Sequence, residues 1–328
     1  MKLNIVMKKA LRLVLLLLGV SAAAFFLVSI SPIDPLQTNI GQAALGSMTE
    51  EQIETLRQYW GVDVPAGERF LYWLSDAVRG DFGTSLLYRR PVMEVIGEKA
   101  GYSLGLMTFA WIISGVVGFL LGVISGACKE RLPDRFITGG ALFLSGTPAF
   151  WIALVFLTVF AVELGWFPVG LAVPMGVPAD QVMLWDKLYH ACLPALTLSV
   201  TGISNIALHT REKMVQVMES DYVLFARARG EDPRSVVLRH GLRNVILPAM
   251  TLQLGSISEI LGGSVLVEQV FSYPGLGQAA VTAGLGGDVP LLLGITILSA
   301  ILVFAGNLAA DLLYSVVDPR MKKGGEPR

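Results

Sequence analysis

Six stretches of this chain are long and apolar enough to cross a lipid bilayer. A helix needs about 20 mostly apolar residues to span a hydrocarbon core of about 30 Å. The stretches that meet this requirement lie at residues 11–30, 103–128, 136–164, 191–209, 246–271 and 290–314; the fourth is the weakest, because Ser and Thr are scattered through it. Charged residues make up only 16% of the chain, whereas soluble domains carry about 25%. The sequence therefore predicts an all-α integral membrane protein with six transmembrane helices.

The first apolar stretch has a second interpretation, as a cleaved signal peptide. Its apolar core is longer than the usual h-region, and no clear A-x-A cleavage site follows it. We therefore expect a retained span.

The distribution of Lys and Arg predicts the orientation. With six spans, 18 of the 25 basic residues fall on one side of the membrane, in the N-terminal tail, the turn after the second span, the loop after the fourth span and the C-terminal tail. Basic residues accumulate in cytoplasmic loops. Both termini are therefore predicted to be cytoplasmic.

The predicted spans divide the chain into four segments. Residues 1–31 form the N-terminal tail and first span, and residues 32–102 an extracytoplasmic loop. Residues 103–320 form the core with the other five spans, including a cytoplasmic loop at 210–245, and residues 321–328 form a basic tail.

The long first loop contains signals for short amphipathic helices. Thr49 and Gln52 form a capping-box pattern. Apolar residues follow at helical spacing, at Ile53, Leu56 and Trp60. A second stripe comprises Phe70, Leu74 and Val78 and is stopped by Gly80, and Pro91 marks the start of a third short helix.

The residues of several enzyme classes are missing. The chain has no Gly-Lys dipeptide and therefore no Walker A loop, and it has no H-E-x-x-H or G-x-S-x-G motif. His190, His209 and His240 are tens of residues apart, and the two cysteines offer no clustered zinc site. A net charge of −1 gives no basic field for nucleic acid. We therefore predict no catalytic residues, no metal site and no nucleic-acid partner.

Few charges lie within the spans. Glu259 lies near the middle of the fifth span and Glu268 near its outer end. A carboxylate in lipid is costly and normally faces the bundle interior. We expect both to line a polar translocation path, although Glu259 could equally form a structural hydrogen bond to a neighbouring helix or subunit. Gly118, Gly122 and Gly126 in the second span predict close helix packing.

The loop at 210–245 is the most specific feature. Its residues 221–230 read as a short helix, followed by a turn at Gly230–Pro233 and a second helix near Arg234. Arginines alternate with apolar residues at helical spacing, which suits a surface offered to a soluble partner. The simpler interpretation is an ordinary basic inner loop.

These residues resemble a known family. Ala226-Arg227-Ala228-x-Gly230 followed by Ile246-Leu247-Pro248 is similar to the EAA loop of ABC-importer permeases. Leu224 and Phe225 replace the consensus glutamate and first alanine, as is usual in the dipeptide/oligopeptide/nickel subfamily. Three further segments resemble that subfamily's motifs, at residues 79–85, 268–277 and 307–320.

The resemblance implies a type I ABC-importer permease fold in a bacterial or archaeal cytoplasmic membrane, in contact with lipid. It implies a second permease subunit, two cytoplasmic ATPase subunits that bind ATP and magnesium, and an extracytoplasmic substrate-binding protein. This chain would bind no cofactor itself and would not be an enzyme.

The resemblance also assigns an ATPase-coupling role to part of the inner loop. The residues concerned are Ala226, Arg227, Ala228, Arg229, Gly230, Arg234 and Pro248. The two alanines would permit close approach, Gly230 a tight turn, and the arginines charge contacts.

The implied substrate is a di- or oligopeptide. The alternative is nickel or a metal–chelator complex, and residues 259–263 read somewhat like the nickel branch. A stand-alone secondary carrier or channel, a membrane-embedded enzyme and a scaffold remain as alternatives of other classes.

Overall fold

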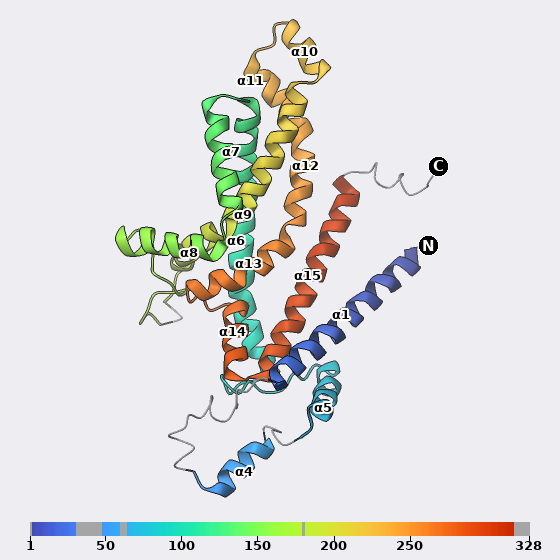
Figure 1. Ribbon diagram of the computed structural model, residues 1–328, viewed down its shortest axis with the longest axis vertical. Coiled ribbons are helices and arrows are strands. Elements are labelled where there is room, and N and C mark those ends of the chain that lie inside the picture. The colour runs from blue at the N-terminus through green and yellow to red at the C-terminus, as the bar shows by residue number, and fades with distance from the viewer. Residues whose placement is uncertain (1, 31–47, 60–63, 179–180, 318–328) are drawn as a thin grey trace. The chain divides into compact units, whose positions relative to one another are not determined.

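The computed structural model describes residues 2–30, 48–59, 64–178 and 181–317 (Figure 1). The regular secondary structure of these residues is helical, apart from one bridge between Thr84 and Pro91. The chain divides into two compact units. The first comprises Met1–Ser103 and Pro274–Phe304, and the second Leu104–Tyr273 and Ala305–Arg328. The basic tail at 321–328 and the end of the C-terminal motif at 318–320 lie outside the described residues.

Four of the predicted spans are continuous helices that are long and apolar enough to cross a membrane. They are Leu11–Ile30 within α1 (Lys2–Ile30), α6 (Val92–Ala127), α9 (Leu184–Met218) and Val289–Ala310 within α15 (Val289–Val317). The other two are bent helix pairs, so the count is six if each pair forms one span. This is consistent with the predicted six.

The first unit contains the short helices expected in the first loop. In α4 (Glu50–Tyr59), the Thr49 N–H donates to Gln52 Oε1 at 3.0 Å and the Gln52 N–H to Thr49 Oγ1 at 3.3 Å, which confirms the capping box. α5 (Ala66–Val78) is followed by Gly80 with φ +90°, a left-handed conformation that favours glycine. Trp60, the last residue of the expected stripe, lies outside the described residues.

The third expected helix is not short. α6 begins at Val92, directly after Pro91, and continues without a break to Ala127. A proline is accommodated ahead of a helix because the first turn needs no backbone donor there. Its first residues form a buried core with α14 (Leu276–Gly286) and the start of α15.

A buried carboxylate organises one end of the first unit. Asp288 is fully buried and accepts hydrogen bonds from Ser85 Oγ at 2.5 Å, the Leu87 N–H at 3.1 Å and the Leu291 N–H at 3.2 Å. The segment 79–85, noted for its resemblance, is thereby held to the first turn of α15. This role is structural.

In the second unit, α6 and α9 pack at very close range. A Cβ atom added at Gly122 would lie 2.5 Å from Thr210 Cβ and 2.6 Å from the Ala207 carbonyl oxygen. Gly118 and Gly126 meet α9 in the same way, one turn to each side. The close packing expected from this glycine repeat is confirmed.

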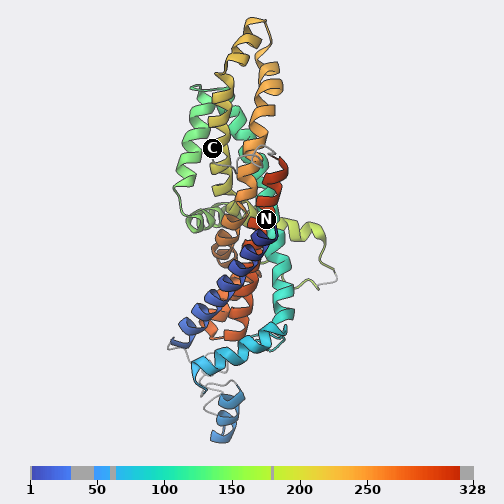
Figure 2. The same cartoon turned by 90° about the vertical axis from the view of Figure 1, so that its right-hand side faces the viewer.

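The two bent pairs also belong to the second unit. α7 (Leu132–Ser145) meets α8 (Ala149–Phe156) and the π-helix η1 (Leu157–Glu163) at 109°, across Gly146-Thr147-Pro148. α11 (Pro233–Val236), π-helix η2 (Val237–Gly241) and α12 (Leu242–Gly255) form one arm, which meets α13 (Ile257–Val270) at 50° next to Ser256. α7 and α12 pack against α9, and α13 packs against α8 and α9 (Figures 1 and 2).

We predict that Gly122→Ala destabilises the protein more than the same change at an open helix position. The added methyl group must push α6 from α9, and overpacking of this kind costs about 1–3 kcal/mol. Gly139→Ala in α7 is the matched control, since nothing lies within 4 Å of its Cβ position and alanine favours a helix by about 0.5–1 kcal/mol. Thermal unfolding of the detergent-purified protein measures both. Equal unfolding temperatures for the two variants would contradict the packing.

Candidate functional site

The loop predicted at 210–245 is mostly helical. α9 continues to Met218, α10 spans Asp221–Ala228, and α11 begins at Pro233. Only residues 219–220 and 229–232 interrupt the helices. We call α10, α11 and the turn between them the apex; it lies beyond the ends of α9 and α12 in both views (Figures 1 and 2). The expected helix, turn and second helix are confirmed.

Gly230 ends α10 in a Schellman motif. The Gly230 N–H donates to the Arg227 carbonyl at 2.9 Å, and the Glu231 N–H to the Ala226 carbonyl at 3.2 Å. Gly230 has φ +83°, and the space around its Cβ position is open. Glycine is therefore favoured here by backbone conformation rather than by crowding. Asp232 caps α11 by accepting from the Arg234 N–H at 3.1 Å.

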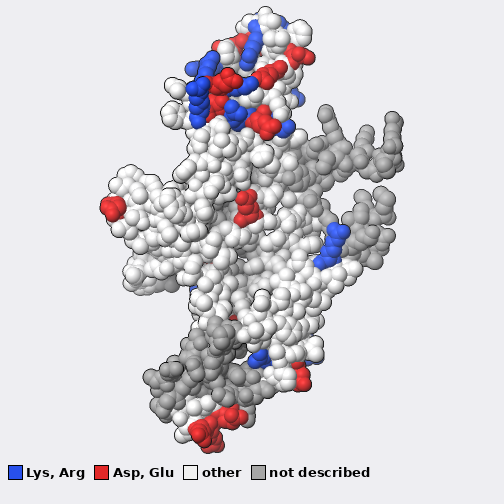
Figure 3. Space-filling view, viewed as in Figure 1, with Lys and Arg blue, Asp and Glu red and all other residues white. Residues whose placement is uncertain are grey.

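The apex exposes most of the residues predicted to couple to an ATPase. Arg227, Ala228, Arg229, Gly230 and Arg234 are exposed. Figure 3 shows charged side chains of both signs gathered at this end of the second unit.

Two residues of the predicted coupling set are not on the exposed surface of the apex. Ala226 is buried in a small core with Val223 and Val236, so its small side chain serves packing inside the apex and not the approach of a partner. Pro248 lies within α12, away from the apex, where the absence of its N–H interrupts the helical hydrogen bonding.

Sequence reasoning missed the apolar part of the apex surface. Leu224 and Phe225 are 66% and 71% exposed, and Tyr222 is also exposed. The signal was present in the sequence, because Leu224 and Phe225 are the two departures from the general EAA pattern. His240 Nε2 lies 3.2 Å from Glu231 Oε2, and Asn244 Nδ2 donates to the Tyr222 hydroxyl at 3.2 Å.

A buried ion pair braces the helices that carry the apex. Asp134, in the first turn of α7, accepts from Arg211 of α9 through Nε at 2.5 Å and Nη2 at 2.7 Å. It also accepts from Ser125 Oγ at 2.6 Å and the Glu130 N–H at 2.8 Å. The Asp134 side chain is 3% exposed. This cluster joins α6, α7 and α9, and sequence reasoning had counted Arg211 only as a basic loop residue.

A second contact reinforces the same junction. The Lys129 ammonium, between α6 and α7, donates to the Glu219 carboxylate just after α9. This hydrogen bond raises the pKa of Lys129 above its ordinary value. Because both side chains are exposed, the contribution to stability is small.

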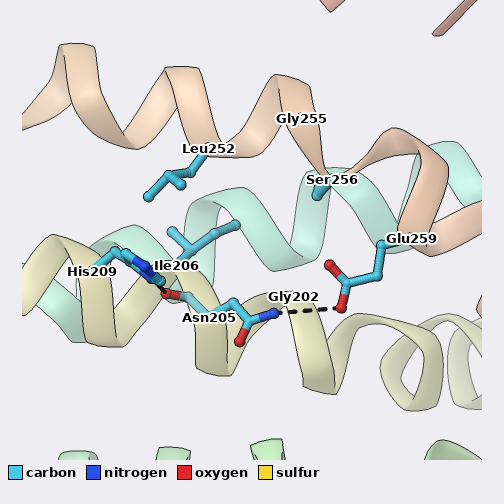
Figure 4. A pocket seen from close by; sticks show the side chains of 8 residues that line it. All are labelled: Gly202, Asn205, Ile206, His209, Leu252, Gly255, Ser256 and Glu259. Carbon is cyan, nitrogen blue, oxygen red and sulfur yellow. Dashed lines mark hydrogen bonds between the residues drawn. The ribbon is translucent and has the colours of Figure 1, made fainter. Parts of the chain in front are cut away.

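A pocket of about 390 Å³ lies between α9 and the bend from α12 to α13. Its polar side chains are Asn205 and His209 from α9, Ser256 at the bend, and Glu259 from α13 (Figure 4). Asn205 Nδ2 donates to Glu259 Oε1 at 3.4 Å. Gly202, Ile206, Leu252 and Gly255 complete the lining.

The structure does not bring the two predicted path carboxylates together. Glu259 is exposed in the pocket, whereas Glu268 is fully buried in the protein and does not line it. The two residues are about two and a half turns apart on α13, so they lie on opposite faces of the helix. Their roles in a translocation path stay predictions.

Comparison with known proteins decides the family. Residues 118–323 match the model of the binding-protein-dependent transport system inner membrane component family. The chain belongs to this family. The matched range contains α9, the apex and the pocket, so both candidate sites lie within the family's shared region.

Named relatives cover nearly the full length of the permease. The oligopeptide transport system permease protein AppB of Bacillus subtilis (strain 168) is 33% identical over 318 residues, 97% of this chain and 98% of AppB. The glutathione transport system permease protein GsiC of Escherichia coli (strain K12) is 35% identical over 320 residues, 98% of this chain and 99% of GsiC.

A solved structure supports the fold. A chain of the inward-facing MetNI methionine ABC transporter matches with a TM-score of 0.56 and 15% identity, covering 69% of this permease and 97% of that chain. The ABC-importer permease fold is thus confirmed. The cytoplasmic position of the termini stays a prediction.

We predict that Asp134→Asn destabilises the permease by about 3–5 kcal/mol, because it leaves the Arg211 guanidinium without its carboxylate in a largely buried site. Glu130→Gln is the control, since it removes an exposed carboxylate just before α7, and we expect a change within about 0.5 kcal/mol. Thermal unfolding in detergent compares the two. A loss no larger for Asp134→Asn than for Glu130→Gln would show that the ion pair does not brace the helices.

Proposed function

We propose that this permease carries di- or oligopeptides across the cytoplasmic membrane of a bacterium or archaeon, as one of two permease subunits of an ATP-driven importer. The supporting observation is the similarity to named peptide permeases over nearly the whole chain. These relatives include AppB, GsiC and a putative peptide permease of Brucella ovis that is 35% identical over 94% of this chain. Sequence similarity over nearly the whole chain favours the same role for this permease.

The apex is the proposed docking site for a cytoplasmic ATPase. Exposed Leu224 and Phe225 supply apolar contact area, and Arg227, Arg229 and Arg234 supply charge around it. Apolar anchors surrounded by charged residues are typical of protein interfaces. ATP and magnesium would bind to two such ATPase subunits, and an extracytoplasmic protein would deliver the substrate. The permease itself would catalyse no reaction.

The helices that carry the apex also form walls of the pocket. α9 runs from Asn205 and His209 towards α10, and α12 runs from the apex to Ser256. Movement of the ATPases would displace the apex, and α9 and α12 would transmit that displacement to the pocket. This is rigid-body coupling between a nucleotide site and a substrate path.

Purification and uptake together test this function. Affinity purification of the permease in mild detergent is expected to recover a second permease and ATPase subunits. Proteoliposomes that contain this assembly and its binding protein are expected to accumulate peptide only with ATP. Peptide accumulation by vesicles that contain this chain alone, without ATP, would overturn the proposal in favour of a secondary carrier.

We predict that Gly230→Glu leaves membrane insertion intact but abolishes ATP-driven uptake and reduces ATPase co-purification at least about tenfold. A side chain at φ +83° strains the Schellman turn, and the new carboxylate lies beside the arginines of the apex. Gly176→Glu is the matched control, because Gly176 also has positive φ, +78°, and open space around it. Full ATPase recovery with Gly230→Glu, or equal loss with Gly176→Glu, would contradict the docking assignment.

A further inference from the structure

We propose that the pocket between α9 and the α12–α13 bend binds the ammonium group at the amino terminus of a transported peptide. This inference rests on the proposed peptide-import function and adds a recognition site to it. The pocket presents hydrogen-bond acceptors and one negative charge, and an ammonium group presents only donors and one positive charge.

Glu259 supplies the negative charge. Its carboxylate is exposed in the pocket, and the hydrogen bond from Asn205 to its Oε1 is long, at 3.4 Å. Eight of the described residues line the pocket, and none of these eight is Lys or Arg. A carboxylate within a membrane-spanning helix is costly without a compensating charge. A cationic ligand provides that compensation.

His209 presents an acceptor to the same pocket. Its Nδ1 lies 2.8 Å from the Asn205 carbonyl oxygen, which can only accept a hydrogen bond. Nδ1 therefore carries the proton, and in the neutral ring Nε2 is left as an acceptor; this tautomer is assigned from the hydrogen bond.

The remaining polar side chains also have acceptor capacity. Ser256 donates its hydroxyl hydrogen to the Gln253 carbonyl at 2.8 Å, which leaves the lone pairs of Oγ. Asn205 uses Nδ2 towards Glu259, so its Oδ1 remains an acceptor. The acceptors are spread along the pocket, with Glu259 beside Asn205 at one end and His209 at the other, so an ammonium group held by Glu259 would have Asn205 as its neighbouring acceptor.

A bound metal ion is the competing occupant. The lining offers one carboxylate and one imidazole as strong metal ligands, and no group of three His, Cys, Asp or Glu side chains placed to hold a metal is found among the described residues. Nitrogen, oxygen and sulfur ligands of a transition metal usually number four or more. The acceptor set therefore favours an ammonium group, and nickel is the alternative outcome of the test.

The test uses the complete importer with its binding protein in proteoliposomes, with ATP and radiolabelled trialanine as the probe. Glu259→Gln removes the charge, and Glu259→Asp keeps it. We expect Glu259→Gln to lower trialanine uptake about tenfold or more, because it removes a charge-assisted hydrogen bond, and Glu259→Asp to retain most uptake. Glu163→Gln, an exposed carboxylate at the end of η1, is the control and is expected to match wild type.

Two readouts separate ligand binding from a merely structural role. N-acetyltrialanine lacks the ammonium group, so its uptake should change less than about twofold in Glu259→Gln; the binding protein is the same throughout, so its own preference cancels in the comparison. Where this uptake is below detection in wild type, the contrast between Glu259→Gln and Glu259→Asp decides. ATP hydrolysis stimulated by the binding protein, and the unfolding temperature, should stay within about 20% and about 2 °C of wild type.

Three results would overturn the inference. They are wild-type trialanine uptake by Glu259→Gln, equal losses for Glu259→Gln and Glu259→Asp, and a loss of radioactive nickel uptake in Glu259→Gln with trialanine uptake unchanged. Failure of the proposed function is distinguishable, because it would show in the wild type as the absence of ATP-dependent uptake of any peptide.

Discussion

The close contact between α6 and α9 is the constraint on which the second unit depends. At Gly118, Gly122 and Gly126 a single added carbon would meet the backbone or Cβ atoms of α9. Lipid is as apolar as the side chains, so membrane helices are held together largely by such packing and by hydrogen bonds between them. Because α9 is fixed along α6, the helices that pack on α9, among them α7, α12 and α13, are held in defined positions. The apex and the pocket are both built on these helices.

Polar contacts hold these helices at fixed positions along one another, since packing alone would allow the helices to slide. The bidentate bond between Asp134 and Arg211 fixes the end of α9 nearest the apex. Further along, Trp111 of α6 and Gln253 of α12 exchange two bonds, from the indole N–H to the Gln253 carbonyl at 2.9 Å and from Gln253 Nε2 to the Trp111 carbonyl at 2.6 Å. These directional hydrogen bonds therefore fix the register of the helices, in addition to the close packing of their surfaces.

Local signals in the sequence predicted local structure well. The run of apolar residues predicted the spans, the glycine spacing predicted the α6–α9 contact, and Gly230 with Pro233 predicted the turn of the apex. What the sequence lacked was information on which face of a helix meets which neighbour. Hydropathy does not register a 109° bend at Pro148, and spacing alone does not reveal whether Glu259 or Glu268 faces a pocket. The pairing of Asp134 with Arg211, 77 residues apart, is likewise a product of the fold.

The bend at Ser256 gives the two walls of the pocket different mechanical properties. α9 is one continuous helix from Leu184 to Met218, with Pro194 inside it, whereas the α12–α13 pair is bent by 50° next to Ser256. In the proposed coupling, displacement of the apex would move the adjoining part of α9, together with the Asn205 amide and the His209 imidazole. The wall formed by α12 and α13 would bend further at Ser256, and α13, packed against α8, would stay in place. The same displacement would therefore separate the polar groups on the two walls of the pocket, so that ligand release follows from the difference between one continuous helix and one interrupted helix.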